Sequence, residues 1–215
     1  MSASESYQLI DPSSATQQVH CPISLCDGQS FHLLEYPSDA PARRERTRLL
    51  LTCDTSQDLE FATAFSEQYA SHFLCTIVEP FGAAKANRIS YVRWLSKQQE
   101  LARNTVVVVL VGPTTSTCAN VDWDVAAALT DSGWGTAGLA GIMLPHYFDM
   151  ASEVRNLRII PHRLSSNTSN GYASLYTWEH VMKRLFNAQM MVHSAMESRQ
   201  MYMIEPDNTL PLRKA

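Results

Sequence analysis

The sequence lacks long apolar runs and any large surplus of one charge. No stretch approaches the roughly 18 consecutive apolar residues that a membrane-spanning helix needs. Its first six residues, MSASES, are polar, so we expect no signal peptide. The chain has 17 Lys and Arg residues against 21 Asp and Glu residues, without the basic face that nucleic-acid-binding domains carry. We therefore expect a cytoplasmic protein with neither nucleic-acid nor membrane partners.

Cysteines are few, and their number is odd. Of the five, Cys53 and Cys75 lie in apolar runs that predict buried strands, which suits reduced thiols in the cytosol. Cys21 and Cys26 lack a second pair and a histidine at ligand spacing. We therefore predict no zinc site there and no other metal site.

Several catalytic and phosphate-binding motifs are also missing. The turn at residues 112–115 has neither the spacing nor the lysine of a Walker loop, and no GxGxxG follows the first expected strand. The chain has no GxSxG nucleophile elbow and no HExxH zinc helix. His146 follows an expected strand, where it is either a catalytic candidate or an ordinary surface or capping residue.

Hydrophobic residues make up 45% of the chain and charged residues 18%, which is enough for a substantial core. Apolar runs predict strands buried on both faces. They lie at residues 49–53, 73–78, 105–111 and 139–145. Helical spacing of apolar residues predicts helices between these strands. The alternation predicts an α/β fold of three layers, with a mostly parallel sheet of four to five strands flanked by helices.

The chain divides by composition into three parts. Residues 1–45 are rich in Ser, Gln, Asp and Pro, and we expect an extension that forms a hairpin or an edge strand. Residues 46–198 form the α/β domain, whose last helix is expected to begin near Ser174. Residues 199–215 carry weak signals and are expected to fray.

Local turn and capping signals refine this picture. The polar stretch after the first strand offers several helix N-caps, and Asn120 is the expected N-cap of the helix after the third strand. Residues 167–171, NTSNG, predict a turn before the last helix.

Several segments together resemble the TIR-like family that includes the signalling subunit of the Thoeris anti-phage system. The resemblance covers about residues 48–196, and it rests on the order and spacing of the segments. They are VVLVGPTTST at 108–117, VDWDVAAA at 121–128, GIMLP at 141–145, IPHRL at 160–164, Asn167, and GYA at 171–173. The resemblance implies a flavodoxin-like (TIR-like) fold.

It also implies an enzyme that cleaves the nicotinamide–ribose bond of NAD, in some relatives with cyclisation of the ADP-ribose into a second messenger. The key group of such enzymes is a Glu early in the helix after the third strand, and Asp124 stands at that position, one methylene shorter. A carboxylate there bonds ribose hydroxyls and stabilises an oxocarbenium-like transition state. The alternative role of Asp124 is that of a first-turn acid favoured by the helix dipole.

The resemblance implies further contacts to NAD, which would be a substrate rather than a tightly bound cofactor. Hydroxyl groups at these positions alternatively cap the next helix, and the tryptophan alternatively packs in the core. The candidates are Cys53, Asp54, Thr55, Ser56, Gly112, Thr114, Thr115 and Trp123. We expect Asp124 to lie in a cleft at the carboxyl edge of the sheet, flanked by the loops after Cys53 and Val78. Residues Thr52 to Ser56 are expected to reach the same space.

The sequence leaves two other functions open. One is a catalytically silent TIR-like module that serves as an assembly or signalling scaffold. The other is a nucleoside-handling enzyme related only by fold. The family resemblance implies self-association in either TIR-like case, and a soluble signal implies an effector protein as a partner.

Overall fold

The computed structural model describes the chain over residues 46–78, 92, 105–131, 135–145, 160–201 and 204–214. The chain divides into two units, Met1–Glu45 and Arg46–Ala215, and every described residue belongs to the second. The expected N-terminal extension, His146, and all of the expected helix over residues 87–104 except Val92 lie outside the described residues.

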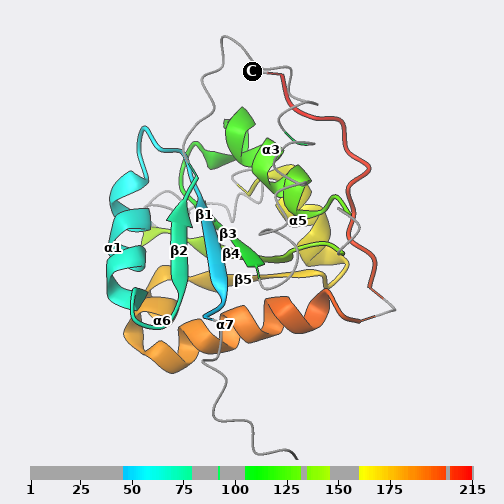
Figure 1. Ribbon diagram of the computed structural model, residues 1–215. Coiled ribbons are helices and arrows are strands. Elements are labelled where there is room, and N and C mark those ends of the chain that lie inside the picture. Colours follow the sequence, from blue (N-terminus) through cyan, green and yellow to red (C-terminus); the bar gives the residue numbers. More distant parts are fainter. Residues whose placement is uncertain are drawn as a thin grey trace, which may run out of the picture. The chain divides into compact units, whose positions relative to one another are not determined.

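Five parallel strands form the sheet, in the order β2-β1-β3-β4-β5 (Figure 1). They are β1 Arg48–Thr52, β2 Leu74–Ile77, β3 Thr105–Val111, β4 Gly138–Met143 and β5 Ala173–Thr177. All seven residues of the central strand β3 are buried, and its β-branched side chains suit a pleated surface covered on both faces. The predicted α/β fold with a mostly parallel sheet is confirmed.

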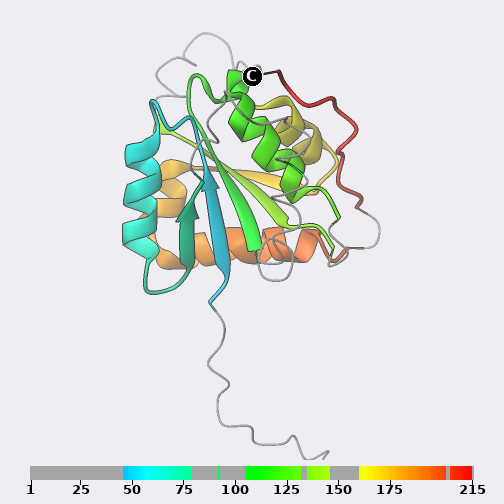
Figure 2. The ribbon, with the colours of Figure 1, turned by 45° about the horizontal axis from the view of Figure 1, so that its top comes forward.

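Helices cover both faces of this sheet (Figure 2). Alternate residues of β3 supply the two layers, because successive side chains of a strand point to opposite faces. The helices are α1 Leu59–Tyr69, α3 Ala119–Ala128, α5 His162–Ser169, α6 Trp178–Lys183 and α7 Leu185–Ser198, with a 3₁₀ turn η1 at Thr115–Thr117. Val107 and Val109 pack with α3 and α5, whereas Val106 and Val108 pack with α1, α6 and α7. None of the helices in the described part is long and apolar enough to cross a membrane.

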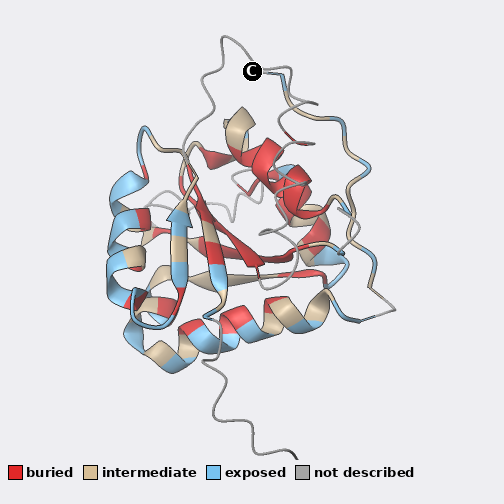
Figure 3. Ribbon diagram, in the orientation of Figure 1, coloured by how far each residue is buried: buried red, intermediate tan, exposed pale blue. Residues whose placement is uncertain are grey.

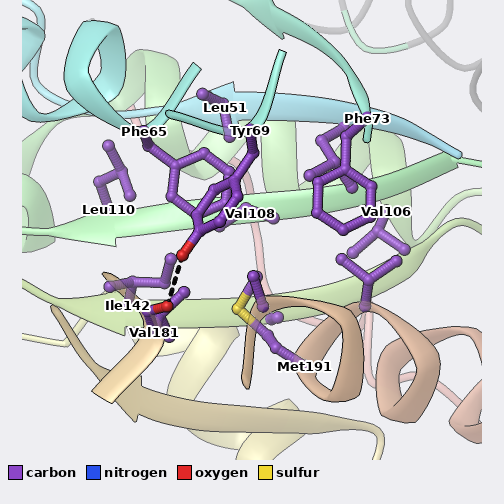
Figure 4. Close-up of a cluster of buried hydrophobic side chains, with 14 of the residues drawn as sticks. Leu51, Phe65, Tyr69, Phe73, Val106, Val108, Leu110, Ile142, Val181 and Met191 are labelled. Atoms are coloured by element: carbon purple, nitrogen blue, oxygen red, sulfur yellow. Dashed lines mark hydrogen bonds between the residues drawn. The ribbon is translucent and has the colours of Figure 1, made fainter. Parts of the chain in front are cut away.

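An aromatic cluster joins α1 to α6 within one layer (Figure 4). The Tyr69 hydroxyl donates a hydrogen bond of 2.6 Å to the buried carbonyl oxygen of Val181, and the Phe65 ring meets the Tyr69 ring edge-on at 4.9 Å. On the same face α7 approaches β4 closely, since a Cβ at Gly138 would lie 2.6 Å from the carbonyl oxygen of Ala195. Glycine at this position therefore fixes how near α7 lies to the sheet.

The expected start of the last helix near Ser174 is wrong. Residues Ala173–Thr177 form β5 in parallel register with β4, and α6 begins only at Trp178. Extended backbone at Arg184 then separates α6 from α7.

Two smaller expectations also need correction. Asn167 lies inside α5 rather than in a turn, and the turn follows at Asn170 and Gly171, where φ of +85° suits glycine. The N-cap of α3 is Cys118, so Asn120 lies in the first turn of the helix.

The expectation that the C-terminal tail frays is also wrong. Residues 204–214, which we call the C-terminal strap, are tied to α5 by side-chain hydrogen bonds (Figure 1). Arg163 donates to Asn208 Oδ1 at 2.7 Å, and Asn167 exchanges two bonds of 2.8 Å with the backbone of Asp207. Ser166 also bonds the Asp207 carboxylate. Hydrogen bonds of the Ser166 and Thr209 hydroxyls hold the pKa of Asp207 at about 2, so the strap stays anchored through this charge at neutral pH.

Candidate functional site

Strands β1 and β3 lie side by side and run in the same direction, so their carboxyl ends meet at one edge of the sheet. Thr52, the last residue of β1, is in register with Val109 of β3. The helix that follows β3 brings Asp124 back to this edge, and the Thr52 hydroxyl donates a hydrogen bond of 2.6 Å to Asp124 Oδ2. Asp124 thus lies at the expected edge of the sheet, beside the end of β1. The expected cleft stays a prediction. The loop after Val78, which was also predicted to flank Asp124, lies outside the described residues.

Helix α3 is buried on all sides from Val121 to Ala128 (Figure 3). Its two acids, Asp122 and Asp124, are separated by about 200° around the helix axis and therefore face opposite ways. Asp122 pairs with Arg163 of α5 and accepts a bond of 2.9 Å from the backbone NH of Arg213 in the strap. Asp124 instead faces the sheet and is 4% exposed.

Asp54 joins the loop after β1 to the turn after β3. Its Oδ1 accepts bonds from the backbone and the hydroxyl of Ser56, and its Oδ2 accepts a bond of 2.6 Å from the hydroxyl of Thr114. Burial raises the pKa of Asp54, but these hydrogen bonds outweigh burial and leave the pKa below its usual value. The ionised carboxylate thus holds the two loops together beside Asp124.

Gly112 makes room for a third acid beneath the same turn. Asp58, the fully buried N-cap of α1, lies so close that a Cβ at Gly112 would be 2.3 Å from its Oδ2. The Gly112 NH donates to Thr115 Oγ1 at 2.8 Å, and this hydroxyl lies 3.4 Å from the Asp58 carboxylate. Gly112 and Thr115 are therefore engaged in packing the turn after β3 onto α1.

The thiol of Cys53 lies among these acids and stays protonated. Burial, followed by the negative charges of Asp58, Asp54 and Asp124, raises its pKa to about 12. Burial also raises the pKa of Cys118, at the start of α3. Neither thiol is therefore an activated nucleophile, because nucleophilic cysteines have a lowered pKa.

We expect Cys53 to resist alkylation by iodoacetamide at pH 8 in the folded protein. With a pKa of about 12, the thiolate fraction at pH 8 is on the order of 10⁻⁴. Because the folded pKa is raised, this protection holds at neutral pH and is lost as the pH rises toward 12. Peptide mapping by mass spectrometry measures the labelling, and the same protein in urea is the control. Rapid labelling of Cys53 in the folded protein would contradict the expectation.

Trp123 lies in the core and contacts the C-terminal strap. It is 2% exposed, and its indole NH donates a bond of 3.0 Å to the carbonyl oxygen of Arg213 in the C-terminal strap. This position favours the packing alternative, and the NAD contact of Trp123 stays a prediction. Thr55 is half-buried on the Asp54 loop.

The structure thus gathers most of the predicted residues at one edge of the sheet, and it gives Thr52 and Asp58 specific contacts there. Thr52 is the one hydroxyl in the apolar run LLLTC, and a polar residue in such a run is a signal that was available in the sequence. Asp58 was expected only as one of several N-caps. Among the described residues, no group of three His, Cys, Asp or Glu side chains is arranged to hold a metal ion.

The comparison with protein families bears directly on this edge of the sheet. Residues 54–146 match the family model of the Thoeris protein ThsB, TIR-like domain. The predicted resemblance to the TIR-like family is confirmed. The TIR-like match begins at Asp54, two residues after the end of β1, and it contains α3 with Asp124. The match to this TIR-like domain supports a role in anti-phage defence. No curated protein and no solved structure matches the chain.

Proposed function

We propose that this chain cleaves the nicotinamide–ribose bond of NAD and converts the ADP-ribose part into a cyclic ADP-ribose type signal in anti-phage defence. The observation that carries the proposal is the Asp124 carboxylate, which is held by Thr52 at the carboxyl edge of the sheet within the TIR-like match. NAD is the substrate in this proposal, and no tightly bound cofactor takes part.

Cleavage of the nicotinamide–ribose bond requires one carboxylate close to the ribose. When the bond between the ribose C1′ and the nicotinamide nitrogen breaks, nicotinamide leaves with the electron pair as a neutral base. The ribose then carries positive charge, which Asp124 stabilises. Water ends the reaction by attacking C1′ and losing a proton, whereas attack by another atom of the same ADP-ribose closes a ring. Because Asp124 is 4% exposed, its charge acts with less screening than a surface carboxylate would have.

The surroundings of Asp124 suit this substrate in charge. Asp54 and Asp58 lie at the same edge, and the negative charges of all three acids act on Cys53. The nicotinamide ring of NAD is positively charged before cleavage and neutral afterwards. A site of negative charge therefore attracts the intact ring and releases the product.

The test is incubation of the purified full chain with NAD at several protein concentrations, followed by mass spectrometry of the small molecules. We expect nicotinamide together with ADP-ribose or its cyclic isomer, with activity rising as the protein self-associates. The Asp124→Asn variant tests the role of the carboxylate, because it keeps the size of the side chain and removes its charge. Undiminished turnover by this variant would sink the site assignment.

The second candidate is a catalytically silent TIR-like module that assembles and signals through a partner. The observation that favours it is the low exposure of Asp124, which leaves little of the carboxylate accessible to a substrate. Light scattering over a range of concentrations tests self-association, with NAD turnover measured on the same samples. Assembly without turnover would support the scaffold, and a strict monomer without turnover would contradict both candidates.

A further inference from the structure

We infer that Thr52 is a positioning residue that holds the Asp124 carboxylate in its working orientation. This inference rests on the proposed function, since it assigns a role in the same reaction. Thr52 itself would not touch the substrate. It would act through the hydrogen bond from its Oγ1 to Asp124 Oδ2.

The geometry of Thr52 makes it a fixed donor. The residue ends β1, its backbone is paired with Val109 of the central strand, and its side chain is 1% exposed. A β-branched side chain in a buried strand has little rotamer freedom. A threonine hydroxyl has only one proton to donate, and here that proton is committed to Asp124.

The bond also has the features of a strong one. Its length of 2.6 Å lies in the range of hydroxyl donors on ionised carboxylates, which are shorter and stronger than neutral pairs. Neither group is open to water, since both side chains are buried. Water therefore competes little for either partner, and the bond defines where Oδ2 lies.

The orientation of the Asp124 carboxylate matters because its side chain is one methylene shorter than the Glu typical of the TIR-like family that the chain resembles. A displacement of the order of 1 Å at a catalytic group costs about a hundredfold in rate. The shorter side chain has fewer torsions to reach the substrate with, so its position depends on its neighbours. Thr52 comes from the adjacent strand and meets the carboxylate from the sheet side.

The experiment compares Thr52→Val, which keeps the shape and removes the hydroxyl, with Thr52→Ser, which keeps the hydroxyl. The readout is kcat and KM for nicotinamide release from NAD by the full chain. We expect Thr52→Val to lower kcat by about tenfold to a hundredfold with little change in KM. Thr52→Ser is expected to restore most of the loss. Thr105→Val is the matched control, because it removes a buried hydroxyl at the other end of the neighbouring strand β3.

A thermal unfolding cycle supplies a readout that does not need activity. If Thr52 acts through Asp124, the drop in Tm caused by Thr52→Val should become smaller in an Asp124→Ala background. Equal drops in both backgrounds would overturn the inference.

The kinetic outcomes separate this inference from the proposed function. Full kcat in Thr52→Val, alongside a loss in Asp124→Asn, would overturn the positioning role and leave the proposed function standing. Equal losses in Thr52→Val and Thr52→Ser would also overturn it, because the hydroxyl would then not be the cause. A wild-type chain without turnover in the assembled state would overturn the proposed function and the inference with it.

Discussion

Arg163→Ala is expected to lower the free energy of unfolding by about 3 to 5 kcal/mol. Arg163 is fully buried, and its Nε lies 3.3 Å from Asp122 Oδ1, whose side chain is also buried. The substitution would leave the Asp122 charge in the interior without its cation. Breaking a buried ion pair from one side is costly for this reason, even though an intact pair adds little net stability.

The same substitution should release the C-terminal strap. Arg163 donates to Asn208 Oδ1 and to the carbonyl oxygen of Leu210, so both strap contacts are lost together. Urea denaturation measures the stability, and hydrogen exchange of residues 204–214 measures the release. Arg213→Ala is the matched control, because the strap contacts of Arg213 with Asp122 and Trp123 run through its backbone. A stability loss below about 1 kcal/mol would show that the pair is solvated, as surface pairs are.

The central part of the fold was predictable because its sequence signals are local. A run such as TVVVVLV is buried on both faces, so every residue in it must be apolar or small. Strand β5 reads ASLYT, and most of its residues are only partly buried. At the end of the sheet order it needs no continuous apolar run, and its sequence alone therefore predicts the start of a helix.

The C-terminal strap could not be predicted, because its order depends on partners far away in the chain. Its residues have no helical or strand period. They are held by Arg163 and Asn167, which lie about 40 residues earlier. Such contacts follow from the folded arrangement of α3 and α5 and leave no local pattern. A segment with weak local signals can therefore be ordered when buried polar groups elsewhere in the fold form hydrogen bonds with it.

The site was predictable in position and less so in detail. The location of Asp124 followed from topology, because the loops after parallel strands gather at one edge. The direction of Trp123 did not, since the strap decides what covers that side of α3. That Thr52 lies near Asp124 followed from the same topology, whereas the hydrogen bond between them, across 72 residues, depends on the strand register.

Asp124→Glu is expected to impair the protein rather than improve it, although a Glu stands at this position in the resembling family. The side chain is buried, and its carboxylate already meets Thr52 at 2.6 Å. An added methylene must push the carboxylate past that hydroxyl or shift α3. Overpacking of this kind costs about 1 to 3 kcal/mol of stability. The misplaced carboxylate should also lower nicotinamide release on the order of a hundredfold.

Asp124→Asn separates charge from size in the same assay. It keeps the volume, so its stability should stay close to that of the wild type, while loss of the negative charge should lower kcat by about 10² to 10³. Glu60→Gln removes an exposed carboxylate in the first turn of α1 and controls for a general effect of charge. Denaturation curves and kcat for the wild type and the three variants complete the test. An Asp124→Glu protein that is as stable as the wild type and faster would mean that Thr52 does not define the acid's position. The shorter side chain of Asp124 would then lower the reaction rate, and the site would not be adapted to Asp.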